Sequence, residues 1–221
     1  MSLVTGLGLR ATPSLLQALG FSLGQAPGGG PTLSLPNLRV LTGESRGPCL
    51  LLHSPGPLPD TLDGVPCSLL PVRGGGGGGW GEGALHPNGV TRCDHLVIRS
   101  PDWRRTSLAL QGVGWQEARV REDVYPGTRL SFFRVGGAGR GLTLELVAPT
   151  KPKEDGGPAH LWGVTWVAGQ GLEAVAASLG GQFSLSPSRA AVQPGRNIAT
   201  LRGETGGLGM AMAFLTPKEK I

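Results

Sequence analysis

The sequence lacks several features that would indicate a membrane or nucleic-acid protein. No run of about 18 apolar residues occurs, and the first residues show no basic region followed by a long apolar one. Aromatic residues make up 5% of the chain and are not interleaved with a basic run, so the net charge of +5 predicts a solvated basic surface. Nucleic-acid binding through that surface is the weakest alternative, and it predicts an affinity that falls steeply with salt.

Cysteine is also scarce. The three residues, Cys49, Cys67 and Cys93, show no metal-type spacing and lie in apolar surroundings, so we expect reduced, buried thiols in a cytoplasmic protein. Cys93 and His95 share one face of an unbroken strand, but we expect the cysteine to pack at the strand edge rather than to act as a nucleophile. The glycine patterns of a dinucleotide fingerprint and a P-loop are absent, as is the Gly-x-Ser-x-Gly elbow of hydrolases.

Glycine (39 residues) and proline (19 residues) are abundant and mark the connections. Six consecutive glycines begin at Gly74 and predict a flexible linker over 74–89. A polar stretch at 150–158 makes a second, shorter connection. The chain is thereby divided into three pieces, 1–73, 90–149 and 159–217.

Each piece has the same predicted order of elements, β-α-β-β-β. In the second piece, the strand Asp94 to Arg99 runs into a helix that starts at Ser100-Pro101-Asp102, and three more strands follow. The third piece repeats this order from residue 161, and the first from residue 4. Gly20, Gly112 and Gly180 stand at the three helix ends and predict left-handed caps. A repeat of about 65 residues predicts an α+β protein built from modules.

Four motifs carry a resemblance to a known family. In chain order, these motifs are Asp94-His95-Leu96-Val97-Ile98 with Pro101-Asp102, Phe132-Phe133-Arg134-Val135-Gly136-Gly137, Leu144-Glu145-Leu146-Val147, and Val192-Gln193-Pro194-Gly195-Arg196. Over 90–217 the chain resembles the paired βαβββ modules of the vicinal oxygen chelate superfamily, which includes glyoxalase I, extradiol dioxygenases and bleomycin-resistance proteins. The resemblance implies a curled mixed sheet, the glyoxalase-like barrel, with helices outside. Piece 1–73 shares only the element order and is expected to be a degenerate module. We expect it to pack on the other two or to pair with its copy in a homodimer.

The resemblance also implies a divalent metal, Zn, Fe, Mn or Ni, held by the first and last strands of each module. His95 and Glu145 fall on these two ligand positions in the second module. In the third module, Trp162 takes the first-strand position, and Ala213 stands opposite Glu145. His160, two residues before Trp162, is the candidate for a displaced third ligand. The sequence therefore predicts half of a metal site.

The same residues can act without metal. Glu145 lies on an aliphatic strand and needs a partner, for which Arg134 and Arg99 are the local candidates. In the alternative, His95 is a hydrogen-bonded histidine that pairs with Glu145. Burial would raise the pKa of Glu145 and suit it to act as a base beside His95. The candidates for ligand binding are Arg99, Arg134, Trp162 and Arg196.

Two functions follow from these residues. The first is a glyoxalase-like enzyme of the lyase, isomerase or dioxygenase type that acts on a small oxygenated or carbonyl compound between the modules. The second is a non-catalytic protein of the same fold that sequesters a small molecule, as resistance proteins do. Stoichiometric metal in the purified protein, lost in a His95→Ala variant, would favour the metal-dependent enzyme.

Overall fold

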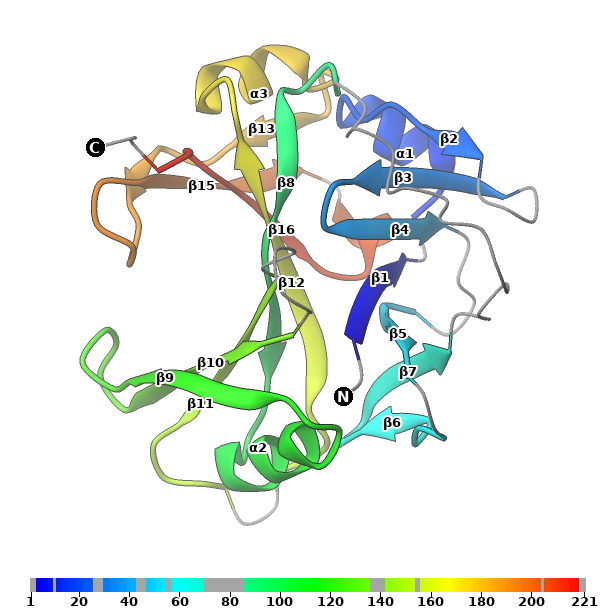
Figure 1. The fold of residues 1–221 in the computed structure, drawn as a ribbon. Coiled ribbons are helices and arrows are strands. Elements are labelled where there is room, and N and C mark those ends of the chain that lie inside the picture. Colours follow the sequence, from blue (N-terminus) through cyan, green and yellow to red (C-terminus); the bar gives the residue numbers. More distant parts are fainter. Residues whose placement is uncertain are drawn as a thin grey trace.

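Two β-sheets make up the molecule (Figure 1). The computed structural model describes residues 3–9, 11–25, 30–42, 47–54, 57–69, 86–135, 142–153, 156–203 and 205–218. The predicted linker lies outside these residues except for 86–89. No helix in the described part of the chain is long and apolar enough to cross a membrane.

The first sheet is formed by the N-terminal residues and has seven strands in the order β2-β3-β4-β1-β5-β7-β6. Its elements are β1 (Leu3–Leu9), α1 (Pro13–Ala18), β2 (Gly24–Gln25), β3 (Pro31–Leu35), β4 (Leu38–Thr42), β5 (Cys49–His53), β6 (Thr61–Leu62) and β7 (Val65–Leu69).

The second sheet has nine strands in the order β13-β15-β16-β12-β8-β11-β10-β9, with β14 paired to β15. One half consists of β8 (Val90–Arg99), α2 (Trp103–Gly112), β9 (Gln116–Arg121), β10 (Thr128–Arg134) and β11 (Thr143–Pro149). The other half consists of β12 (His160–Ala168), α3 (Leu172–Ser178), β13 (Phe183–Leu185), β14 (Arg189–Ala190), β15 (Asn197–Gly203), a short 3-10 helix (Thr205–Leu208) and β16 (Ala211–Leu215).

One pairing rule repeats in the two sheets. The last strand of a unit lies parallel to its first strand in β8–β11, β12–β16 and β1–β4. First strands of neighbouring units then pair antiparallel, as β8 does with β12 and β1 with β5. The predicted α+β fold of βαβββ units is confirmed, although over the described residues both sheets are open paths of strands rather than closed rings.

The N-terminal sheet holds more than one unit. After the βαβββ unit of β1 to β4, strand β5 pairs parallel with β7, and β6 pairs antiparallel with β7. In these pairings, β5 corresponds to the first strand of a second unit, β6 to its third and β7 to its last. No helix lies among the described residues between β5 and β7. The boundaries of the three modules stay a prediction. The strand pairing indicates a shortened fourth unit within the first of them.

The helix ends agree with the sequence only in part. Asp102 caps α2 as predicted, because its side chain accepts hydrogen bonds from the amides of Arg104 and Arg105. Gly20 takes the predicted left-handed conformation after α1, with φ of 75°. The prediction for Gly112 was wrong: this residue is still helical, and Gly114 adopts φ of 87° two residues later. Gly180 is not among the residues with positive φ, because α3 ends in the extended residue Leu179.

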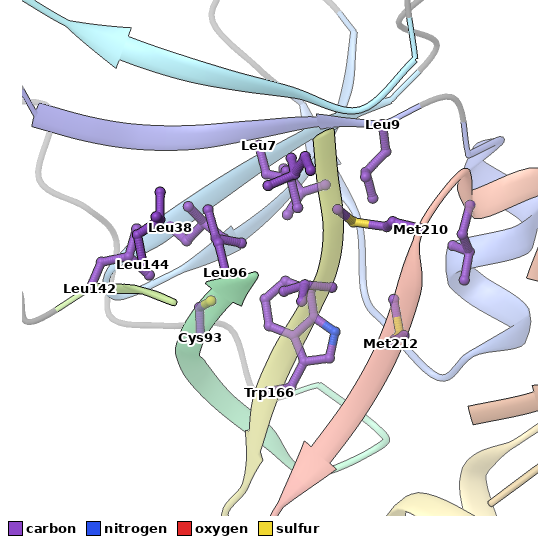
Figure 2. Packing of buried hydrophobic residues seen from close by; sticks show 14 of the residues in the cluster. Leu7, Leu9, Leu38, Cys93, Leu96, Leu142, Leu144, Trp166, Met210 and Met212 are labelled. Carbon is purple, nitrogen blue, oxygen red and sulfur yellow. The ribbon is translucent and has the colours of Figure 1, made fainter. Parts of the chain in front are cut away.

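The core lies between the two sheets. Leu7, Leu9 and Leu38 of the first sheet pack in one cluster with Leu96 and Trp166 of the second (Figure 2). The described strands of the first sheet therefore cover one face of the nine-stranded sheet, which we call the back face. A homodimer is not needed to cover that face, and it remains a prediction.

Candidate functional site

A pocket of about 430 Å³ lies on the face of the nine-stranded sheet opposite the back face. Strands of both halves and the segment 189–193 line it. Its polar and aromatic lining residues are His95, Arg99, Arg119, Tyr125, Thr128, Phe132, Glu145, Trp162, Thr165, Arg189, Gln193 and Thr200.

His95 reaches the pocket because β8 alternates as predicted over its second half. His95, Val97 and Arg99 line the pocket, whereas Leu96 and Ile98 are fully buried in the core. The strand also carries the core residue Cys93, which is fully buried. The prediction that Cys93 shares a face with His95 and packs at the strand edge was wrong.

A β-bulge at Asp94 causes this difference. His95 pairs with Thr165 and Cys93 pairs with Trp166, so two neighbouring residues of β12 face three residues of β8. Asp94 is the extra residue. A bulge re-aims side chains next to it, and here it lets Asp94 and His95 lie together, although they are adjacent in the strand. The oxygen Oδ2 of Asp94 lies 2.9 Å from Nδ1 of His95.

Glu145 completes a row of three side chains. On β11, Glu145 pairs with Val97, two residues along β8 from His95. Its Oε2 lies 3.3 Å from Nε2 of His95, and both side chains are about 15% exposed. We refer to these three residues as the Asp94–His95–Glu145 row. The predicted neighbours His95 and Glu145 are thus in contact, and the imidazole is held between two carboxyl groups.

Asp94 is fixed by the segment before β15. Arg196, 3% exposed, donates from Nη1 to Oδ1 of Asp94 at 2.7 Å, and Gln193 donates from Nε2 to Oδ2 at 3.2 Å. Burial would raise the pKa of Asp94, but the hydrogen bonds from His95 and Arg196 outweigh burial and hold this pKa well below its ordinary value. An ionised carboxylate only accepts hydrogen bonds, so Nδ1 of His95 carries a proton.

Glu145 is perturbed in the opposite direction. Burial raises the pKa of Glu145, and the charges of His95 and Arg119 only partly offset this. Nε2 of His95 faces Oε2 of Glu145, so the imidazole and the carboxyl group lie side by side at the pocket, where a general acid or base must stand.

The third unit does not supply a matching set. Trp162 is itself the extra residue of a bulge, because Leu161 pairs with Ile98 and Gly163 pairs with Val97. In the second unit, His95 pairs with Thr143, which stands two residues before Glu145. In the third unit, Gly163 pairs with Ala211 of β16, which stands two residues before Ala213. Gly163, not Trp162, is therefore the counterpart of His95, and Trp162 is the counterpart of Asp94. The counterpart positions of His95 and Glu145 have no ligating side chain.

The other predicted residues occupy different places. Arg99 and Trp162 line the pocket, and the guanidinium of Arg99 lies 4.7 Å from the centre of the Trp162 ring. Arg196 supports Asp94 from a buried position and does not line the pocket. Arg134 is exposed and borders a separate hollow. The prediction that Arg134 or Arg99 pairs with Glu145 was wrong, since His95 takes that place.

His160 does not join the site. It pairs with Arg99, four residues along β8 from His95, and is exposed to solvent beside a different hollow. No group of three or more His, Cys, Asp or Glu residues in the described part of the chain could hold a metal ion. A metal does not fit the donors present, because His95 and Glu145 are the only His, Cys, Asp or Glu residues among the described residues that line the pocket, and a catalytic metal site commonly needs three protein ligands.

Sequence reasoning missed Asp94, Gln193 and Arg119. The strict alternation of a strand places Asp94 in the core, and only the bulge brings it to the pocket side. Gln193 lies within a motif quoted from the sequence, but no local pattern showed that it contacts Asp94 across 99 positions. Arg119 lies on the edge strand β9, with its guanidinium 4.7 Å from the ring of Phe132. The only feature that could have indicated Arg119 is a basic residue placed opposite an aromatic residue of a strand that lines the pocket.

Comparison with known proteins gives likenesses at low identity. The sequence matches no family model and no curated protein. Among solved structures, the chain is similar to methylmalonyl-CoA epimerase from Mycobacterium tuberculosis, at 18% identity and a TM-score of 0.44, over 58% of this chain and 89% of that one. It is also similar to a variant of the Streptomyces coelicolor methylmalonyl-CoA epimerase in complex with 2-nitronate-propionyl-CoA, at 17% identity and a TM-score of 0.45, over 59% of this chain and 99% of that one.

The assignment of the fold rests on strand order. Each complete unit has its last strand parallel to its first, and two units join through antiparallel first strands. The chain therefore has the glyoxalase-like βαβββ fold.

Proposed function

We propose that this chain acts on a small carbonyl compound in the pocket and moves a proton on the carbon next to the carbonyl group. The observation that supports this is the Asp94–His95–Glu145 row, of which His95 and Glu145 line the pocket. A partly desolvated carboxylate with a raised pKa beside an oriented imidazole is the pair of groups that such proton transfer requires.

The chemistry follows from the contact between His95 and Glu145. In the reactive form, Nε2–H of His95 donates to the carbonyl oxygen of the ligand, and Glu145 is a carboxylate. Glu145 then takes the proton from the neighbouring carbon, and the electron pair of that C–H bond moves onto the carbonyl oxygen. Asp94 stabilises the imidazolium that donates to this oxygen. Once Glu145 has exchanged this proton with solvent, a solvent-derived proton returns to the same carbon as the electron pair moves back from oxygen, and the result is hydrogen exchange.

Proton exchange in D₂O tests the proposal directly. Short-chain ketones, 2-oxo acids and their methyl esters are incubated with the protein, and loss of the signal of the proton next to the carbonyl is followed by ¹H NMR. We expect exchange with at least one compound, reduced about 10²-fold or more in Glu145→Gln. Glu173→Gln, an exposed carboxylate in the first turn of α3, is the matched control and should retain the rate. Equal rates in Glu145→Gln and wild type would contradict the assignment of the base.

Metal removal separates this reaction from the metal-dependent alternative. Because the donors do not make a metal site, we expect elemental analysis to find no stoichiometric Zn, Fe, Mn or Ni, and exchange to persist after dialysis against a chelator. Activity that is lost on dialysis and restored by one of these metals would replace the proposal with a metal-dependent one.

A second function is favoured by the third unit. Gly163 and Ala213 leave half of the reactive positions empty of functional groups, as suits a protein that binds without turnover. Such a protein would bind a carbonyl compound with no exchange, and Glu145→Gln would bind it with a similar affinity. Binding and exchange measured on the same compound therefore distinguish the two functions.

A further inference from the structure

The pocket carries an excess of positive charge that the proton-transfer residues do not use. Arg99, Arg119 and Arg189 line it, and Glu145 is the only carboxylate among the described lining residues. Within the described chain, none of the three arginines has a carboxylate at ion-pair distance. Outside the pocket, Arg92, Arg105, Arg121, Arg129 and Arg196 each lie at ion-pair distance from an acid, whereas no ion pair joins Arg104, Arg134 or Arg202 to an acid of the described chain.

Arg99 and Arg119 each stack on an aromatic ring, with the guanidinium 4.7 Å from the ring centre. Arg119 is the one aligned with the base: it lies opposite Phe132 on β10, which in turn lies opposite Glu145 on β11, so the three residues form a line across the sheet. The Arg119 side chain is exposed and lines the pocket. A guanidinium that is held in place and has no acid partner is suited to bind a carboxylate or phosphate through two hydrogen bonds.

The position of Arg119 relative to Glu145 limits what it can bind. Its charge acts on Glu145, but no hydrogen bond or ion pair joins the two side chains. A ligand that fills the space between them would place a negative group at Arg119 and a carbonyl group at the Asp94–His95–Glu145 row. A pocket lined by charge of one sign concentrates ligands of the opposite sign.

We propose that the ligand of this pocket is an anion, a short oxo acid whose carboxylate binds Arg119 while its carbonyl group faces His95. This inference deepens the proposed function and depends on it for the location of the site. Arg99 and Arg189 add attraction over the pocket without fixing the orientation of the ligand.

Matched probes test it. Binding of 2-oxobutanoate and of its methyl ester is measured by isothermal titration calorimetry with wild type, Arg119→Gln and Arg202→Gln. Arg202 is exposed on β15 and does not line the pocket, so its variant matches the change in net charge. We expect the acid to bind at least about tenfold more tightly than the ester. Arg119→Gln should remove this preference, Arg202→Gln should retain it, and added salt should weaken binding of the acid alone.

The outcomes distinguish this inference from the proposed function. Equal affinity for acid and ester, no binding of the acid, or unchanged affinity in Arg119→Gln would each overturn the anion inference. If the ester exchanges its proton as fast as the acid, the proposed function stands without an anion site. If the acid binds through Arg119 but exchanges no proton, the anion site stands and the proposed reaction fails.

Discussion

Asp94 joins the site to the segment before β15 through a buried ion pair. Arg196 and Asp94 are 1% and 9% exposed in their side chains and 2.7 Å apart, so the loss of one charge leaves the other buried and unpaired. We expect Asp94→Asn to lower the free energy of unfolding by about 3 kcal/mol or more, measured by urea denaturation. Asp123→Asn breaks a pair at the surface and should leave stability unchanged. Arg196 also donates to Oε1 of Gln193 at 2.6 Å and to the carbonyl of Thr216 at 2.6 Å, so a stable Asp94→Asn variant would mean that these two hydrogen bonds suffice to hold it.

The burial that raises the pKa of Glu145 also lowers the free energy of unfolding at neutral pH. The pKa of Glu145 is raised by burial, so between about pH 4.3 and that raised pKa the folded state binds more protons than the unfolded state. Stability therefore falls as the pH rises through this window. At pH 7, Glu145→Gln should unfold with a free energy about 0.5–2 kcal/mol higher than wild type, and the gap should close by pH 4.

Thermal and urea unfolding at both pH values measure this effect. Glu173→Gln serves again as the control, because its carboxylate is exposed. A gap that is the same at pH 7 and pH 4 would show that packing of the amide, not the charge, is responsible.

At the scale of elements, the turn between β3 and β4 holds strand β8 next to its bulge. Asn37 donates from Nδ2 to the carbonyl of Cys93 at 2.7 Å and accepts from the amide of Cys93 at 3.0 Å. Asn37→Ala leaves both backbone groups without these partners and should cost about 2–4 kcal/mol of stability. Asn197→Ala, at an exposed position, should change it by less than about 0.5 kcal/mol. If both variants unfold at the same urea concentration, the turn does not hold the strand.

The whole molecule should unfold as one unit, because the core lies between the sheets. A fragment that begins at residue 86 would expose the back face, including Leu96, Ile98 and Trp166. We expect this fragment to aggregate or to bind the dye ANS, and co-expression with residues 1–85 to restore a soluble protein. A soluble, dye-free fragment with native near-ultraviolet circular dichroism would show that the nine-stranded sheet folds alone.

The sequence predicted the parts of the site that regular geometry controls. His95 and Glu145 lie on the first and last strands of one unit, and parallel pairing of those strands brings them together as expected. The sequence left the partner of Glu145 open between His95 and an arginine, because the choice depends on the register between strands: Arg99 pairs with Val147 and Arg134 pairs with Thr143, so neither lies opposite Glu145. The shortened unit of β5 to β7 was hidden because no helix separates its described strands.

The bulge at Asp94 has a consequence for recognising other chains with this site. One extra residue reverses the inward and outward assignment of the positions before it, so an ungapped alignment with an unbulged strand would equate buried Cys93 with a pocket residue. A useful search pattern is therefore an acid directly before the histidine of the first strand, a glutamate on the last strand, and a buried arginine before the third strand of the next unit. Spacing from the helix alone would miss such chains or assign their residues to the wrong face.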